Sequence, residues 1–243
     1  MSNEPIDAVF FDFAGTLFDD RDLREVHLRQ LRFVGAAADV DASDVELRAA
    51  YREGMGAAYR TVANRPAYEH RALFSAAFVA MADALGGRID EATALQAVDR
   101  QYRATIDAAV LRPDSLSTLA ALRQASIHVQ IVSNIDDEQL EPMLDRLGLR
   151  DVIDAATSSE QAGSCKPDPT IYRIALAKAG VEPPQGLFVG DSLRHDVAGP
   201  ASIGMHTAWL APDAEADPGE VHADVVIHAL GEVLEIVGVG VAR

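Results

Sequence analysis

The chain has few of the residues that mark secreted, disulfide-bonded or membrane proteins. Its 243 residues include a single cysteine, Cys165, which excludes an internal disulfide framework and suits a reducing cytosol. No apolar run approaches the roughly 20 residues that a membrane helix needs, and the first residues show no basic region followed by an apolar one. From these absences we expect a cytoplasmic protein without a membrane partner.

Positive charge is scarce as well. Lys and Arg total 21 against 38 Asp and Glu, so the formal net charge is -17. This charge argues against non-specific binding to nucleic acid or to anionic membranes, but it does not forbid a locally positive pocket. Only two of the cations are lysines, Lys166 and Lys178, and Lys166 stands inside a Lys-Pro-Asp-Pro turn. We therefore select Lys166 as a candidate functional residue.

The apolar pattern indicates an α/β domain. Hydrophobic residues make up 49% of the chain, which is enough for a sizeable core. Apolar stretches alternate with helical patterns after residue 110, and this alternation predicts a parallel sheet covered on both faces. We expect strands at residues 6–13, 128–132, 187–189 and 206–210, with short apolar segments near 152–156 and 225–227. We expect helices at residues 115–124, 138–147 and 170–179. Another should follow Gly190-Asp191-Ser192 and end at residue 203, and a final helix should follow the apolar segment at 225–227. An acidic surface loop is expected at residues 211–223.

A long helical block follows the first predicted strand. Its sequence is rich in Ala, Arg and Glu, and its apolar residues recur at helical spacing. Breakers at 64–66 and 86–87 separate its helices, which we expect near residues 28–35, 45–59, 72–85 and 90–110. We therefore predict a core domain of residues 1–18 and 110–243 and a helical cap domain of residues 19–109. An insert at this point would cover the carboxyl edge of the sheet.

The candidate functional residues occupy strand ends or the loops beside them. In an open parallel sheet these positions share the carboxyl edge, outside which ligands bind. Each residue alone fits a plainer role as a helix cap, a turn or a solvated side chain, but the joint arrangement indicates a function. The residues are Asp12, Ser133 with Asn134, Lys166, and Asp191 with Asp196.

These residue types suit phosphoryl transfer. Asp12 and Asp191 offer the hard oxygen ligands that Mg²⁺ prefers, and a metal between them would allow Asp12 to approach a phosphate and attack phosphorus. Ser133, Lys166 and backbone N–H groups around Gly15 would hold the phosphate oxygens and offset charge in the transition state. Asp196 would hold metal-bound water or the cations of the site.

The same stretches resemble the four motifs of the haloacid dehalogenase superfamily of hydrolases. The resemblance covers the whole chain, because residues 19–109 match its inserted helical cap in position and character. In order, the matching stretches are Asp12-Phe13-Ala14-Gly15-Thr16, Ser133-Asn134, Lys166-Pro167 and Gly190-Asp191 through Asp196.

The resemblance implies a Rossmann-like core, a nucleophile at Asp12 and a cap whose movement gates the site. It implies that Mg²⁺ is bound by Asp12, the backbone carbonyl of Ala14 and Asp191, with Asp196 acting through water. The implied phosphate-binding residues are Gly15, Thr16, Ser133, Asn134 and Lys166.

One position departs from the resemblance. Phosphatase members carry a second Asp two residues after the nucleophile, and this chain has Ala14 there. The missing general acid matters, because such groups contribute about 10²–10⁴-fold. Four explanations stay open: a leaving group that needs little protonation, an acid from the cap, an Ala introduced to trap substrate, or a protein that binds phosphorylated ligands without turning them over. The candidate cap acids are His27, Glu69 and His70.

Two groups of the superfamily lack the second Asp. Phosphonoacetaldehyde hydrolases have Ala there but need a cap lysine for a Schiff base, and residues 17–165 contain no Lys. The 2-haloacid dehalogenases work without metal and lack an acid at the place of Asp191. We therefore expect a Mg²⁺-dependent phosphohydrolase acting on a small phosphorylated metabolite, with a phospholigand binder or a C–X bond hydrolase as alternatives. We expect a monomer or homodimer. Arg24, Arg52, Tyr59 and Arg60 are candidate substrate contacts, although a place on a solvated helix face is the plainer role for each.

Overall fold

The structure is a computed structural model that describes residues 5–19, 23–211 and 221–239. Its contacts divide the chain into two compact units. The core unit comprises Met1–Asp19, Val110–Asn134 and Met143–Arg243, and the cap unit comprises Asp20–Ala109 and Ile135–Pro142. The sequence analysis assigned residues 135–142 to the core because they follow a predicted strand, whereas their contacts group them with the helical insert.

The core unit contains a six-stranded sheet in the order β3-β2-β1-β4-β5-β6, and every neighbouring pair is parallel. All four residues of β1 are buried, which explains why this central strand reads as an unbroken apolar run. The strands are β1 (Ala8–Phe11), β2 (His128–Ser133), β3 (Ala155–Ser158), β4 (Gly186–Gly190), β5 (His206–Leu210) and β6 (Val225–Ile227). The predicted α/β fold class is confirmed.

The register brings the candidate site to one edge of the sheet. Phe11, the last residue of β1, pairs with Ile131 in β2 and with Val189 in β4. Asp12, Ser133 and Asp191 come one or two residues after these paired positions in the chain. Since the strands are parallel, these residues meet at the same carboxyl edge.

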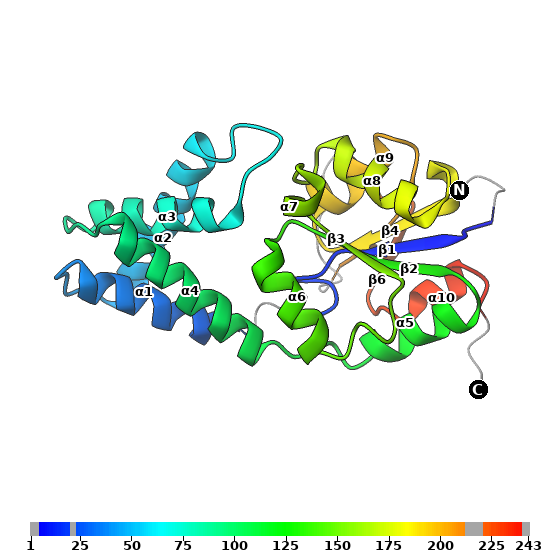
Figure 1. Cartoon of the computed structure of the whole chain (residues 1–243), viewed down its shortest axis with the longest axis horizontal. Coiled ribbons are helices and arrows are strands. Elements are labelled where there is room, and N and C mark those ends of the chain that lie inside the picture. The colour runs from blue at the N-terminus through cyan, green and yellow to red at the C-terminus, as the bar shows by residue number, and fades with distance from the viewer. Residues whose placement is uncertain (1–4, 20–22, 212–220, 240–243) are drawn as a thin grey trace. The chain divides into compact units, whose positions relative to one another are not determined.

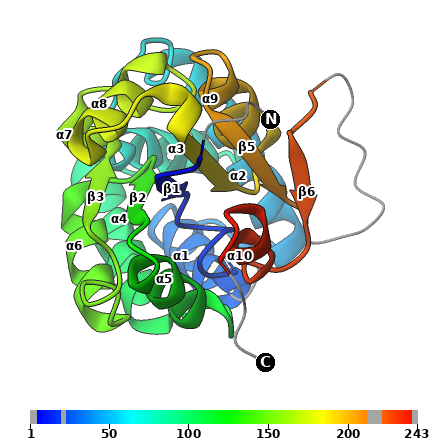
Figure 2. The same ribbon diagram turned by 90° about the vertical axis from the view of Figure 1, so that its right-hand side faces the viewer.

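Helices cover both faces of the sheet, as Figure 2 shows. On one face α8 (Pro169–Ala179) packs against β2 and β3, and α9 (Gly199–Ala201) packs against β5. On the other face α5 (Ser115–Gln124) packs against β2, and α10 (Glu232–Ile236) packs against α5. Tyr172 from α8 meets Phe188 from β4 edge to face, with ring centroids 5.4 Å apart. The short helix α7 (Ser159–Ala162) links β3 to the loop before α8.

The segment after β4 differs from the expected single helix that ends at residue 203. It forms a π-helical turn at Leu193–Ala198 and then the short α9. Pro200 lacks the N–H that an α-helix would direct to the carbonyl of Asp196, which disfavours a regular α-helix through this point. The loop predicted at residues 211–223 lies largely outside the described residues.

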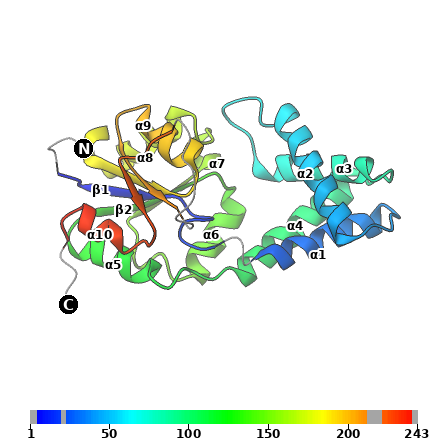
Figure 3. The ribbon, with the colours of Figure 1, turned by 180° about the vertical axis from the view of Figure 1, so that it is seen from behind.

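The cap unit is built from four helices, which are seen from behind in Figure 3. Two of the starts carry clear capping signals: Ser43 and Glu46 form a capping box at α2, and Asp90 accepts from the N–H of Thr93 at α4. The helices are α1 (Arg24–Ala37), α2 (Asp44–Thr61), α3 (His70–Ala84) and α4 (Glu91–Ala108). The segment Ile135–Pro142, which includes the start of α6 (Asp137–Arg146), belongs to the same unit.

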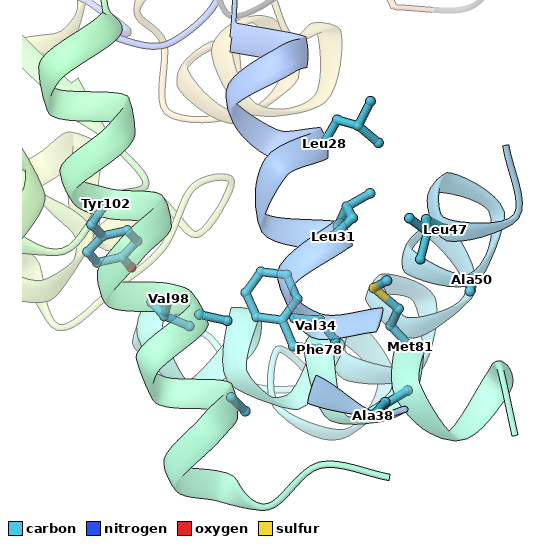
Figure 4. Close-up of a cluster of buried hydrophobic side chains, with 13 residues drawn as sticks. Leu28, Leu31, Val34, Ala38, Leu47, Ala50, Phe78, Met81, Val98 and Tyr102 are labelled. Carbon is cyan, nitrogen blue, oxygen red and sulfur yellow. The ribbon is translucent and has the colours of Figure 1, made fainter. Parts of the chain in front are cut away.

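The four cap helices share an apolar cluster, drawn in Figure 4. Leu31 and Val34 from α1, Phe78 and Met81 from α3 and Val98 from α4 take part in it. The helices α2 and α3 approach closely at a glycine of α2, where a Cβ would clash with backbone atoms of α3. Across the described residues, no helix is both long and apolar enough to cross a membrane.

Candidate active site

Asp12 begins the loop that leaves the central strand β1. Its backbone N–H donates to the carbonyl of Val189 at 2.9 Å, and the residue is 6% exposed. Two hydroxyls hold its carboxylate: Thr16 Oγ1 donates to Oδ2 at 3.3 Å, and Ser133 Oγ donates to Oδ1 at 3.3 Å. The carboxylate is therefore fixed at the sheet edge by groups from its own loop and from the neighbouring strand.

The loop after Asp12 folds back in one turn, in which the N–H of Leu17 donates to the carbonyl of Phe13 at 2.8 Å. Gly15 has a φ of 87°, a conformation that favours glycine. A Cβ at Gly15 would also lie 2.5 Å from Oδ2 of Asp191. Glycine at this position therefore allows the Asp191 carboxylate to approach the loop, while the side chain of Ala14 stays exposed.

Arg112 holds the same loop from outside, a contact that the sequence analysis did not predict. Its Nη2 donates to the Gly15 carbonyl at 2.7 Å, and its Nε donates to the Thr16 carbonyl at 2.9 Å. Its backbone N–H donates to the Leu17 carbonyl at 2.9 Å. Arg112 follows the cap insert directly in the chain, so its place at the return point was the available signal. No motif or charge pattern distinguishes it from the other arginines.

Lys166 is the cation of the site. Its Nζ donates to Oδ1 of Asp12 at 2.6 Å and to Oδ1 of Asp196 at 2.7 Å, and its side chain is 2% exposed. The lysine therefore lies between two carboxylates that come from opposite ends of the sequence. Its ammonium offsets their charge in a region closed to bulk water.

Asn134 positions the lysine loop. Its Nδ2 donates to the carbonyl of Lys166 at 2.9 Å, and its Oδ1 accepts from the N–H of Lys166 at 2.6 Å. The side-chain amide thus pairs with the lysine backbone as another peptide group would. The phosphate contact predicted for Asn134 stays a prediction, and the observed bonds show that its side chain holds the backbone of Lys166.

Two further acids come from the segment after β4. Asp191 is exposed, and its backbone carbonyl accepts from Nε1 of Trp209 at 2.9 Å. Asp196 is 1% exposed, and its Oδ2 accepts from the N–H of Ser192 at 2.9 Å. Both oxygens of Asp196 are therefore engaged, one by Lys166 and one by the backbone.

Burial and charge shift the pKa values of this pair. Burial raises the pKa of Asp196 to about 6, with Asp12 adding to the rise and Lys166 opposing it. Burial lowers the pKa of Lys166, but Asp12 and Asp196 outweigh burial and raise it above its ordinary value. The lysine is therefore charged across the physiological range, whereas Asp196 takes up a proton in mildly acidic solution.

The carboxylates of Asp12, Asp191 and Asp196 form a cluster in which one oxygen from each lies within 4.8 Å of the other two. Such an all-oxygen donor set fits a hard divalent cation. Asp12 and Asp196 share the Lys166 ammonium, and both oxygens of each accept hydrogen bonds from neighbouring groups. The exposed carboxylate of Asp191 leaves the cluster open to solvent on its side.

The other candidates belong to the cap unit. Three of them are candidate general acids and the other four are candidate substrate contacts. These roles stay predictions, because the cap and the core are separate units. Arg24 and His27 lie in α1, Arg52, Tyr59 and Arg60 in α2, and Glu69 and His70 at the start of α3.

A parallel Rossmann-like sheet that carries clustered carboxylates and a buried lysine at its carboxyl edge, with a helical insert after its first strand, defines a class of capped α/β hydrolases. The sequence pattern of one family, described as haloacid dehalogenase-like hydrolase, matches residues 6–204. The chain belongs to this family, as the motif resemblance predicted.

Curated relatives of more than one activity are similar to the chain. It is 30% identical over 152 residues to a ribulose-1,5-bisphosphate 5-phosphatase of Halopiger xanaduensis, covering 59% of this chain and 64% of the relative. It is 31% identical over 124 residues to (S)-2-haloacid dehalogenase 4A of Burkholderia cepacia, covering 51% and 52%. The chain thus matches less than two thirds of the length of either relative.

The fold is shared with solved structures over nearly the whole chain. A HAD-hydrolase of Bacillus subtilis, YfnB, whose structure is described as bound to magnesium, has a TM-score of 0.77 and 20% identity. The match covers 96% of this chain and 99% of that one. At this identity the likeness shows the fold alone.

Proposed function

We propose that the chain is a Mg²⁺-dependent phosphohydrolase that acts on a small phosphorylated metabolite through an aspartyl-phosphate on Asp12. One observation carries the proposal: one carboxylate oxygen from each of Asp12, Asp191 and Asp196 lies within 4.8 Å of the other two, with the Lys166 ammonium 2.6 Å from Asp12. Clustered carboxylates would repel a phosphate unless cations offset them. The site holds one such cation and suits a second.

The proposed ligands of Mg²⁺ are the carboxylates of Asp12 and Asp191 and the backbone carbonyl of Ala14, with Asp196 acting through water. When bound, the ion supplies positive charge that stabilises the transferring phosphoryl oxygens. The remaining steps depend on side chains of the chain itself.

In the first step an oxygen of Asp12 attacks phosphorus, and the bond between phosphorus and the leaving-group oxygen breaks. Ser133, Lys166 and the N–H groups around Gly15 hold the phosphoryl oxygens while charge shifts onto the leaving group. In the second step water attacks the phosphorus of the aspartyl-phosphate. Inorganic phosphate leaves, and the carboxylate of Asp12 is restored.

Ala14 defines the class of leaving group. An alanine methyl cannot give a proton to the departing oxygen, and general acid help is worth about 10²–10⁴-fold. We propose a substrate whose leaving group needs little protonation, such as an acyl, enol or anhydride phosphate. An acid from the cap is the alternative within the same reaction.

The test is phosphate release from a metabolite panel by the wild type, Asp12→Asn and a control, Asp151→Asn, which changes an exposed aspartate of the core. We expect Asp12→Asn to abolish release and Asp151→Asn to retain it. Equal release by all three proteins would overturn the assignment of Asp12. A wild type that binds inorganic phosphate but releases none from any substrate would instead be a phospholigand binder.

Ala14→Asp distinguishes the explanations for the missing acid. If only the acid is lacking, turnover of ordinary phosphate monoesters rises by up to about 10²–10⁴-fold. If the substrate needs no acid, monoester turnover gains little and turnover of the native substrate falls or stays level.

Dehalogenation is the second candidate function. It is favoured by Ala14 and by the similarity to the Burkholderia cepacia dehalogenase. Chloride release from 2-chloroacids in metal-free buffer measures it directly. The acidic residue at position 191 argues against it, and we expect no release.

A further inference from the structure

Asp136 is a buried carboxylate outside the cluster described above. It is 3% exposed and comes three residues after Ser133 and two after Asn134. It belongs to the cap unit, together with the rest of Ile135–Pro142. A buried carboxylate is costly unless its oxygens are bonded, so its partners indicate why it is there.

Three donors from two cap helices converge on Asp136. Its Oδ1 accepts from the N–H of His70 at 2.8 Å, and its Oδ2 accepts from the N–H of Arg71 at 2.7 Å. The hydroxyl of Tyr102, from α4, donates to Oδ2 at 2.9 Å. Asp136 therefore ties α3 and α4 to the segment that continues from Ser133.

Asp136 serves as the N-terminal cap of α3 from a distance of 66 residues in sequence. The residue at the local cap position, Glu69, makes no side-chain capping bond. The first N–H groups of a helix need a partner, and a carboxylate there also interacts favourably with the helix dipole. The start of α3 is therefore capped by Asp136, which follows β2 in the chain, and not by a residue next to the helix in sequence.

A second bond strengthens the same link. The Nη1 of Arg71 donates to Oε1 of Glu138 at 2.8 Å, and Arg71 also pairs with Asp99 on α4. Asp136 and Glu138 therefore both join Ile135–Pro142 to α3, and Asp136 also joins it to α4. Only two residues separate Asp136 from Ser133. Two residues span at most about 7 Å of chain, so the backbone of Asn134 cannot move far from the hydrogen-bonded Asp136.

We propose that Asp136 is a positioning residue that couples the pair Ser133-Asn134 to the cap helices α3 and α4. The inference rests on the proposed function, in which Ser133 binds phosphate. Asn134 ends a segment of the core unit and Ile135 begins one of the cap unit, so a displacement of Ile135–Pro142 reaches the backbone of Asn134 through one peptide bond. Asn134 in turn holds the backbone of Lys166, so cap position and the phosphate-binding groups change together.

The experiment is hydrogen–deuterium exchange with and without Mg²⁺ and inorganic phosphate. In the wild type we expect phosphate to slow exchange at residues 133–134 and also at residues 70–74. In Asp136→Asn, protection at 133–134 should remain and protection at 70–74 should be lost. The control Asp83→Asn, which changes an exposed acid on the same helix, should behave as the wild type does.

Kinetics supply a second measurement. We expect kcat/KM of Asp136→Asn to fall about 2- to 30-fold, the range of typical coupling effects, and the milder Tyr102→Phe to fall less. Circular dichroism verifies that the variants remain folded, and Tyr102→Phe keeps the test valid if Asp136→Asn does not fold.

The outcomes separate the two claims. Protection at 133–134 without any change at 70–74 in the wild type would overturn the coupling and leave the proposed function standing. Protection at 70–74 that persists in both Asp136→Asn and Tyr102→Phe would overturn it as well. Absence of protection at 133–134 would overturn the proposed function and, with it, the coupling.

Discussion

Replacement of Lys166 by methionine removes the cation that lies 2.6 Å from Asp12 and 2.7 Å from Asp196. Methionine is similar in length, so the site stays filled, but two buried carboxylates are left without their partner. Removing one member of a buried ion pair typically costs about 3–5 kcal/mol. Because the lysine side chain is only 2% exposed, water cannot replace the lost contacts. We expect a loss of this size in the unfolding free energy at pH 8.

The cost should depend on pH in a defined direction. Burial raises the pKa of Asp196 to about 6 even with the lysine present, and loss of Lys166 raises that pKa further. A carboxyl whose pKa is higher in the folded than in the unfolded protein takes up protons on folding. Its unfavourable contribution is therefore largest at high pH and shrinks as the pH falls toward about 4, the ordinary value for Asp. The destabilisation should be smaller at pH 5 than at pH 8.

The assay is urea unfolding followed by circular dichroism at both pH values in buffer with a metal chelator. Lys178→Met is the matched control, since Lys178 is the other lysine of the chain and donates to the Thr157 hydroxyl at 2.8 Å. We expect this variant to lose about 1 kcal/mol, with no change between the two pH values. The reasoning is refuted if Lys166→Met loses no more stability than Lys178→Met, or the same amount at both pH values.

Three further predictions concern the scaffold. Gly54→Ala should destabilise the protein by about 1–3 kcal/mol, because its Cβ would clash with the Ala77 carbonyl. Gly56→Ala, on the same helix but with room for a Cβ, should stabilise the protein by about 0.4–1 kcal/mol. Thermal unfolding compares the two variants, and equal effects would contradict the packing argument. Arg112→Lys keeps the charge but loses the forked contact with two loop carbonyls, so the Mg²⁺ affinity measured by calorimetry should fall roughly tenfold, a loss of about 1.4 kcal/mol. An unchanged affinity would show that the loop keeps its conformation without Arg112. Burial raises the pKa of Asp136, but hydrogen bonds from the start of α3 outweigh burial and lower the pKa overall, so the carboxylate stabilises the fold above about pH 4 and this stabilisation is lost below. The unfolding free energy of Asp136→Asn in urea should therefore differ from that of the wild type at pH 7 and converge with it near pH 2. The same difference at both pH values would contradict this.

Much of the fold was predictable because its signals are local. The run Ala8-Val9-Phe10-Phe11 is apolar without alternation, which is typical of a strand buried on both faces. Helices of the insert followed from spacing and from caps such as Ser43 and Asp90. Elements whose form depends on one backbone bond were harder to predict, as the π-helical turn before Pro200 shows.

The candidate site was predictable for residues that stand at strand ends or in the loops that follow them. Asp12, Ser133 and Lys166 are joined by hydrogen bonds as the parallel arrangement led us to expect. The contacts of Arg112 and Asp136 were not predictable, because each pairs with atoms far away in sequence and neither belongs to a local pattern. Long-range pairing of this kind becomes visible only when the chain is folded.

The account depends most directly on the proposed binding of a divalent cation between Asp12 and Asp191. Calorimetric titration of Mg²⁺ into the wild type, Asp191→Asn and the control Asp151→Asn measures it without a known substrate. We predict one binding event in the wild type and in Asp151→Asn, and its loss in Asp191→Asn. Equal binding in all three proteins, or no binding in the wild type, would contradict the account.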